Sequence, residues 1–254
     1  MMPTRFILLC HARTGSTLLG SLLASHPQIS GAGEYYKVLK RRVQDGLHRQ
    51  LVFRLARRYP PLYLDWRAFR CGRPVFGCKF TPPYAADFER SITALHRRGW
   101  RIVHLQRRDV VTSTLSGMVA SMNKRWSTSV GETPPTPSLM RLDPLAFLNA
   151  VRHRLALNDQ EERSLAGLPR LKVVYEDDLA DADCWPATTE RVFAYLDLSP
   201  VPARSAVQKT WSRPYSEIIE NYAELIEVVG NSDLADLLLH IQAPNRAPAR
   251  RGQV

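Results

Sequence analysis

The sequence predicts an α/β fold in which a parallel central sheet is flanked by helices. Short apolar runs of strand length recur along the chain, and the longer stretches between them have the apolar periodicity of helices. This alternation is typical of parallel strands joined by crossover helices. The chain has 254 residues, of which 44% are hydrophobic and 23% charged. These values suit one globular domain, which we place at residues 1–240.

Four apolar runs are expected to form strands: Phe6–Cys10, Val75–Phe80, Arg101–Leu105 and Lys172–Tyr175. Five stretches are expected to form helices: residues 15–25, 84–98, 109–122, 143–166 and 187–196. Asp109 stands where an N-cap residue is expected for the third of these helices.

Three regions interrupt this alternation. Residues 38–70 are basic and aromatic, and we expect them to form a helical cap outside the sheet. Residues 124–143 are rich in Ser, Thr and Pro, which predicts a mobile loop over the site. Residues 241–254 lack apolar side chains for a core and are expected to be a disordered tail.

The net charge of +11 favours anionic partners, such as a nucleotide, nucleic acid or a membrane surface. No run approaches the roughly 20 apolar residues that span a bilayer. Phe6–Cys10 is too short for the core of a signal peptide, so we expect a cytoplasmic protein. The four cysteines have neither metal-ligand spacing nor the density of a disulfide scaffold. Cys10 and Cys78 are expected to be buried apolar residues.

The turn His11-Ala12-Arg13-Thr14-Gly15 joins the first strand to the first helix, which starts with Ser16 and Thr17. Backbone N–H groups in such a turn and the helix dipole both favour an anion. Arg13 adds a full positive charge, and the hydroxyls of Ser16 and Thr17 add donors. The alternative is an ordinary turn in which Gly15 only allows close packing.

This turn differs from the GxxxxGK[ST] loop of many nucleotide-binding proteins. Ser16 and not Lys follows Gly15, and the third strand leads to Arg107 and Arg108 instead of an Asp that would hold Mg²⁺. Fixed cations in place of a metal suit a reaction that needs no Mg²⁺. Transfer of a sulfuryl group is such a reaction, and we therefore expect no metal site.

Further residues follow the predicted strands, where ligands bind in parallel sheets. Arg108 and Ser116, which is two helical turns beyond Asp109, can hold one phosphate, or the arginines can be a surface pair beside a helix cap. Lys79 ends the strand VFGCKF and can face an anionic leaving group. Tyr175 in KVVYEDD can stack on a purine, or it can be a half-buried strand tyrosine.

These segments, in this order, resemble the sulfotransferases that use 3′-phosphoadenosine 5′-phosphosulfate (PAPS), which have a P-loop NTPase-like fold. ARTGSTLL is similar to the family's 5′-phosphosulfate loop, and RRDVVTSTLS to its 3′-phosphate motif. FGCKF resembles the strand that ends in an active-site Lys, and VVYEDDLAD resembles the segment near the adenine. SHPQISGAGEYY and SRPYSEIIENYAEL look most like bacterial carbohydrate sulfotransferases of the trehalose and nodulation-factor type.

The resemblance implies a role for each matching residue. The 5′-phosphosulfate would be held by Arg13, Thr14, Gly15, Ser16 and Thr17. The 3′-phosphate would be held by Arg108 and Ser116, with Tyr175 at the adenine and Lys79 at the bridging or sulfuryl oxygen. The product would be adenosine 3′,5′-bisphosphate.

The resemblance leaves more than one candidate for the general base. The cytosolic branch of the family has a His two residues after the strand Lys, and here Thr81 stands there. The bacterial carbohydrate branch has a Glu soon after the first helix, and GAGEYY supplies Glu34 at that place. Glu34 can also be a solvated loop carboxylate or a helix cap, and His11 and His26 are alternative bases.

The leading hypothesis is a metal-independent, PAPS-dependent sulfotransferase that acts on a hydroxyl of a sugar, glycolipid or other small-molecule acceptor. The alternatives are an ATP-dependent P-loop kinase, which the missing Lys and Asp disfavour, and a basic nucleic-acid-binding module, which the dispersed charge disfavours. We therefore expect no nucleic-acid partner and no transmembrane segment. The acceptor and the oligomeric state cannot be read from the sequence.

Overall fold

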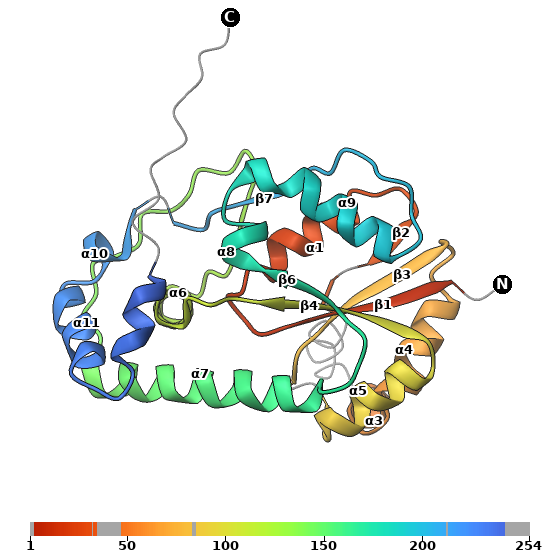
Figure 1. Ribbon diagram of the computed structural model, residues 1–254, viewed down its shortest axis with the longest axis horizontal. Coiled ribbons are helices and arrows are strands. Elements are labelled where there is room, and N and C mark those ends of the chain that lie inside the picture. Colours follow the sequence, from red (N-terminus) through yellow and green to blue (C-terminus); the bar gives the residue numbers. More distant parts are fainter. Residues whose placement is uncertain (1–2, 32, 35–46, 83–84, 212, 242–254) are drawn as a thin grey trace, which may run out of the picture. The chain divides into compact units, whose positions relative to one another are not determined.

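The computed structural model describes residues 3–31, 33–34, 47–82, 85–211 and 213–241 (Figure 1). The chain divides into two compact units, which are described separately. The first comprises residues 1–108 and 156–208, and the second comprises residues 109–155 and 209–254. The predicted tail beyond residue 241 and residues 38–46 of the predicted cap lie outside the described residues. The assignment of residues 1–240 to one domain stays a prediction.

A five-stranded parallel sheet forms the centre of the first unit, in the order β2-β3-β1-β4-β6. Its strands are β1 (Thr4–Cys10), β2 (Ile29–Gly31), β3 (Val75–Phe80), β4 (Trp100–Gln106) and β6 (Leu171–Val174). The predicted parallel α/β architecture is therefore confirmed. The sequence analysis did not predict β2, which has only three residues.

Helices cover both faces of this sheet. They are α1 (Ser16–Ala24), α3 (Leu47–Arg58), α4 (Pro60–Phe69), α5 (Phe88–Arg97), α8 (Tyr175–Asp178), η3 (Ala182–Cys184) and α9 (Trp185–Tyr195). The short strand β7 (Val207–Gln208) ends the unit. The described part of the predicted cap forms α3 and α4, in agreement with its predicted helical character.

Alternate residues of β1 face two separate apolar cores, as the period of a strand requires. Phe6, Leu8 and Cys10 pack in one core with residues of α1 and α9. Ile7 and Leu9 pack in the other core with residues of α4 and α5. Figure 1 shows these two pairs of helices on opposite sides of the sheet. Cys10 and Cys78 are fully buried and not in disulfides, as predicted.

The second unit is mostly helical. Its elements are α6 (Val110–Met122), β5 (Thr128–Ser129), the first part of α7 (Pro144–Ser164), α10 (Tyr215–Ile218), α11 (Tyr222–Gly230) and η4 (Ala235–His240). The carboxylate of Asp109 accepts a hydrogen bond from the backbone N of Thr112 at 2.8 Å, which confirms the predicted helix cap. Met140, in the predicted loop over residues 124–143, forms an isolated parallel β-bridge with Ile219.

Candidate functional site

The turn between β1 and α1 has the backbone expected of an anion-binding turn. Gly15 precedes α1 with a φ of 88°, and Arg13 also lies in the left-handed region with a φ of 65°. The hydroxyl of Thr14 donates to the carbonyl of His11 at 2.8 Å and thereby fixes the turn. Gly15 has no side chain to cap α1, so the first N–H groups of this helix are available to a ligand. Ser16 is buried and Thr17 is exposed.

Tyr175 lies against this turn. A Cβ atom at Gly15 would approach Cδ2 of the Tyr175 ring to 2.5 Å, so a residue with a side chain does not fit there. Arg107 contacts both the Tyr175 ring and the turn. Its guanidinium lies 4.5 Å from the ring centroid of Tyr175, and its Nη1 donates to the carbonyl of Arg13 at 3.2 Å. The ring is therefore held beside Gly15, and its contact with an adenine stays a prediction.

The predicted strand over Lys172–Tyr175 is shifted by one residue, because β6 runs over Leu171–Val174. β6 ends at Val174, and Tyr175 is the first residue of the short helix α8. The carboxylate of Asp178 accepts a hydrogen bond from the backbone N of Val174 at 2.6 Å. This bond gives the N–H of Val174, the last residue of the edge strand β6, a partner four residues further along the chain, which favours a helical turn there.

Lys79 and Glu34 are brought together at the carboxyl end of β3. The Lys79 side chain is almost fully buried, and its Nζ lies 3.2 Å from Oε1 of Glu34. The backbone N of Lys79 also donates to the carbonyl of Gly33 at 2.9 Å, which holds the segment after β2 alongside β3. A buried ammonium thus has a carboxylate partner, as burial of a charge requires.

The surroundings of Cys10 show that Lys79 lies near the start of the turn. Burial raises the pKa of the Cys10 thiol to about 12. The positive charge of Lys79 and a hydrogen bond with Ser16 lower this pKa. The negative charges of Glu161 and Glu34 raise it further. The last residue of β1 therefore has Lys79, Ser16, Glu34 and Glu161 within electrostatic range.

Arg108 is held by a carboxylate of α8. Its Nη1 and Nη2 donate to the two carboxylate oxygens of Asp177 at 2.7 and 2.5 Å, and its backbone N donates to Glu176 at 3.0 Å. This bidentate pair raises the pKa of Arg108 and lowers that of Asp177. Ser116 is buried in α6 of the second unit, so its role beside Arg108 stays a prediction.

A buried cluster of two histidines and a glutamate was not predicted. Oε1 of Glu161 lies 2.7 Å from Nε2 of His104, and its Oε2 lies 3.1 Å from Nε2 of His11. Burial raises the pKa of Glu161, but the hydrogen bonds and charges of His104 and His11 outweigh it and lower the pKa to about 2. His11 begins the turn, so the cluster fixes a side chain at the site.

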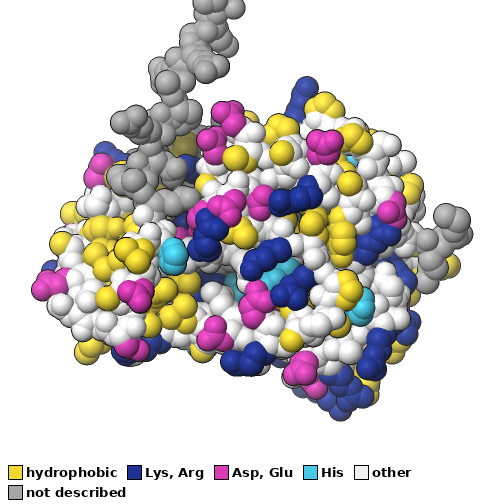
Figure 2. Space-filling view, viewed as in Figure 1, with side chains coloured by type: hydrophobic (Ala, Val, Ile, Leu, Met, Phe, Trp, Pro, Cys, Tyr) yellow, Lys and Arg dark blue, Asp and Glu magenta, His cyan; other side chains and the backbone are white. Residues whose placement is uncertain are grey.

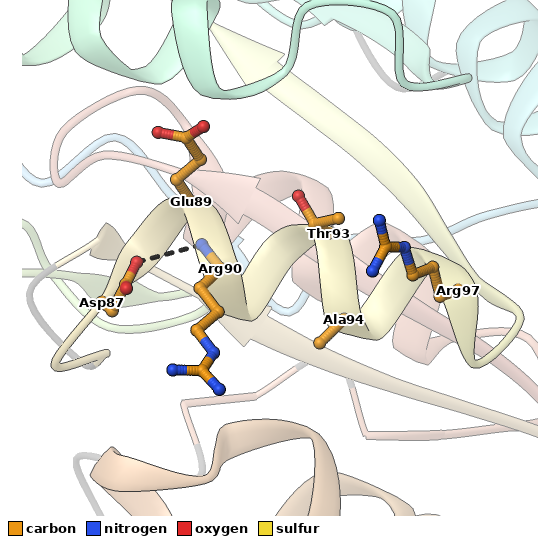
Figure 3. A pocket seen from close by; sticks show the side chains of 6 residues that line it. All are labelled: Asp87, Glu89, Arg90, Thr93, Ala94 and Arg97. Atoms are coloured by element: carbon orange, nitrogen blue, oxygen red, sulfur yellow. Dashed lines mark hydrogen bonds between the residues drawn. The ribbon is translucent and has the colours of Figure 1, made fainter.

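Two pockets lie along α5 and not at the turn. One has a volume of about 390 Å³ and is lined by Asp87, Glu89, Arg90, Thr93, Ala94 and Arg97 (Figure 3). In Figure 3 the carboxylate of Asp87 points to the backbone N of Arg90. It accepts a hydrogen bond from this N–H at 3.0 Å and thereby caps α5. The second pocket, of about 300 Å³, also includes residues of α4. These pockets add no chemistry to the site at the turn.

The described residues contain no group of three or more His, Cys, Asp or Glu placed to hold a metal ion. Among the helices that the structure describes, none is long and apolar enough to cross a membrane.

Comparisons with known proteins give a likeness of fold. No family model and no curated protein matches the chain. Its fold is similar to that of a sulfotransferase from Alicyclobacillus acidocaldarius, with 14% identity over 94% of each chain and a TM-score of 0.50. The sulfotransferase domain of the curacin biosynthetic pathway matches 79% of this chain with 76% of its own, at 16% identity and a TM-score of 0.48. That of the olefin synthase from Synechococcus PCC 7002 matches 78% with 74%, at 15% identity and a TM-score of 0.43.

The first of these likenesses shows the fold and only the fold. The chain has the parallel, P-loop NTPase-like α/β architecture that also occurs in a sulfotransferase. Because unrelated activities share such architectures, the function must be argued from the site.

Proposed function

We propose that this protein is a sulfotransferase that transfers a sulfuryl group from PAPS to a hydroxyl of a sugar, glycolipid or other small-molecule acceptor. The observation that carries the proposal is the pair formed by the buried Lys79 and the partly buried Glu34, which lies within electrostatic range of the end of β1. This pair supplies a cation for a leaving anion and a carboxylate for a proton. The likeness in fold to a sulfotransferase supports the same class of reaction.

The described residues fit a donor that carries several anionic groups. Arg13, Thr14, Gly15, Ser16 and Thr17 would hold the 5′-phosphosulfate with the uncapped N–H groups at the start of α1. Tyr175 would contact the adenine, with Arg107 holding its ring in place. Arg108 and Ser116 would hold the 3′-phosphate, and Arg108 would then exchange Asp177 for that phosphate.

The reaction requires one proton transfer and one exchange of bonds at sulfur. The donor, when bound, supplies the sulfuryl group: a bond forms from the acceptor oxygen to sulfur while the bond from sulfur to the phosphate oxygen breaks. Glu34 accepts the proton of the acceptor hydroxyl. Lys79 stabilises the negative charge that develops on the leaving phosphate. The acceptor class that we propose is a carbohydrate, on the basis of the segments that resemble bacterial carbohydrate sulfotransferases.

Calorimetric titration with adenosine 3′,5′-bisphosphate in the presence of EDTA tests the donor site. We expect saturable binding of one nucleotide, and weaker binding of ATP with or without Mg²⁺. A preference for ATP with Mg²⁺ would contradict the proposal and favour a kinase. Labelled PAPS, incubated with a panel of sugars, glycolipids and phenols, then tests the transfer itself. Binding of the nucleotide without transfer to any sugar would contradict the carbohydrate assignment.

A further inference from the structure

Helices α3 and α4 expose an apolar stripe. Its six side chains, each half exposed or more, are Leu51, Leu55, Tyr59, Leu62, Trp66 and Phe69. Leu51 and Leu55 lie four residues apart on α3, which is the spacing of neighbours on one helix face. Leu62, Trp66 and Phe69 have the same kind of spacing on α4, and Tyr59 lies between the two helices. We call these residues the α3–α4 stripe.

The stripe is unusual because the opposite face of the same helices is already buried. Ala56, Leu64 and Ala68 pack in the core that contains Ile7 and Leu9. A helix on the surface of a globular protein normally turns polar residues to the solvent. Contiguous exposed apolar side chains mark a surface that meets a partner.

Among the described side chains of residues 50–70, every exposed charge is an arginine, and beside them the exposed Asp87 lines a pocket with Arg58, Tyr59 and Leu62. Arg54, Arg57, Arg58 and Arg70 are exposed, and no carboxylate of the described residues forms an ion pair with them. Asp65, the acidic residue of α4, is buried and paired with Arg5 and Arg98 elsewhere. Figure 2 shows Lys and Arg side chains gathered over the region where Figure 1 draws α3 and α5.

The arginines and the aromatic side chains are interleaved. The guanidinium of Arg58 lies over the Tyr59 ring at 5.9 Å, and that of Arg70 lies over the Trp66 ring at 5.4 Å. Trp and Tyr rings beside arginines are the residue types that favour the interface between lipid headgroups and acyl chains.

We propose that the α3–α4 stripe binds the surface of an anionic lipid bilayer. The apolar side chains enter the headgroup region, and the four arginines contact lipid phosphates. A nucleic acid fits less well, because its bases bind to π faces and half of the stripe consists of leucines. This proposal goes beyond the proposed function and does not depend on it, since it concerns binding alone.

Co-sedimentation of the full chain with vesicles tests the proposal. We expect binding to vesicles that contain phosphatidylglycerol and little binding to vesicles of phosphatidylcholine alone. The double variant Leu62→Ser/Phe69→Ser should bind at least on the order of tenfold more weakly, because it removes apolar area from the membrane contact. The matched control, Leu145→Ser/Leu239→Ser, removes two exposed leucines of the second unit and should bind like the wild type.

The role of charge is tested in the same assay. Arg54→Gln/Arg58→Gln should weaken binding by about fivefold per arginine. The control Arg163→Gln/Arg204→Gln, which removes two exposed arginines elsewhere, should have a smaller effect. The proposal is overturned if the wild type does not bind anionic vesicles, if both stripe variants bind as tightly as their controls, or if the stripe binds a DNA oligonucleotide and no vesicle. Unchanged thermal unfolding of each variant confirms that its fold is intact.

Discussion

Nζ of Lys79 lies 3.2 Å from Oε1 of Glu34, although the two residues belong to segments 45 residues apart. β3 brings them together, because its backbone also holds Gly33 through the N–H of Lys79. The pair therefore rests on main-chain geometry as well as on charge.

Glu34→Gln should lower turnover by at least a hundredfold and leave the affinity for adenosine 3′,5′-bisphosphate unchanged. The amide keeps the shape of the side chain but cannot accept the proton of the acceptor. Steady-state rates and calorimetry measure the two effects. Glu89→Gln, at an exposed carboxylate of α5 (Figure 3), is the control and should retain wild-type turnover. A near-normal rate for Glu34→Gln would transfer the role of base to a histidine such as His11.

Gly15→Ala should destabilise the protein more than Gly72→Ala does. Both positions have positive φ angles, 88° and 67°, so both alanines carry a left-handed strain of about 1–2 kcal/mol. Only the Cβ at position 15 meets the Tyr175 ring, whereas nothing lies within 4 Å of the Cβ at position 72. Urea unfolding measures the difference, and calorimetry should show weaker nucleotide binding for Gly15→Ala alone. Equal losses of stability would show that the ring moves freely.

Arg108→Ala should abolish the binding of adenosine 3′,5′-bisphosphate. Its guanidinium is expected to hold the 3′-phosphate, so the affinity for adenosine 5′-phosphosulfate, which lacks that group, should change little. Arg191→Ala is a matched control, because Arg191 is also bound to a carboxylate of α8, that of Asp178. Undiminished binding of the bisphosphate by Arg108→Ala would remove this residue from the site.

Asp177→Asn should strengthen the binding of adenosine 3′,5′-bisphosphate. The Asp177 carboxylate holds both outer nitrogens of Arg108, and a 3′-phosphate would have to displace it. The amide is a weaker partner for a guanidinium. Calorimetry at the same ionic strength compares the two proteins. Weaker binding by the variant would indicate that Asp177 orients Arg108 for the nucleotide and does not compete with it.

Acid should destabilise the protein through Glu161. The pKa of this carboxylate is about 2 in the folded chain and near 4.5 in the unfolded chain, so its contribution is complete above pH 4.5 and is lost as the pH falls towards 2. A difference of this size corresponds to about 3 kcal/mol. The free energy of unfolding, measured with denaturant at about one-unit intervals between pH 6 and pH 2, follows this loss. Glu161→Gln should be less stable near neutral pH and should show a flatter pH dependence.

The sequence predicted the longer strands of the sheet because each forms a distinct apolar run. The runs that became β1, β3 and β4 are continuous, apolar and bounded by turn residues, and Asp109 is a strong cap signal. β2 was missed because three residues, one of them a glycine, carry no period. The end of β6 was misplaced because Tyr175 suits a strand by its type, while the hydrogen bond from Val174 to Asp178 decides for a helix.

The candidate site was predicted only in part, because some of its residues are neighbours in the sequence and others are far apart in it. The Arg13–Thr17 turn is local, so its residues could be read together. The pairing of Glu161 with His11 and His104 depends on where the end of α7 packs, and nothing in a single sequence gives that register. The sequence analysis gave Asp177 no role, because Asp177 and Arg108 are 69 residues apart and only the fold places them together.

Asp65 is bound on three sides, by Arg5 at 2.7 Å, by the indole N–H of Trp100 at 2.8 Å and by Arg98. These contacts hold the inward face of α4 against β1 and β4, and Trp66 and Phe69 lie exposed on its other side. The outward face of this helix is consequently a permanent property of the chain that needs no trigger. A concentrated preparation without lipid should therefore tend to self-associate through it.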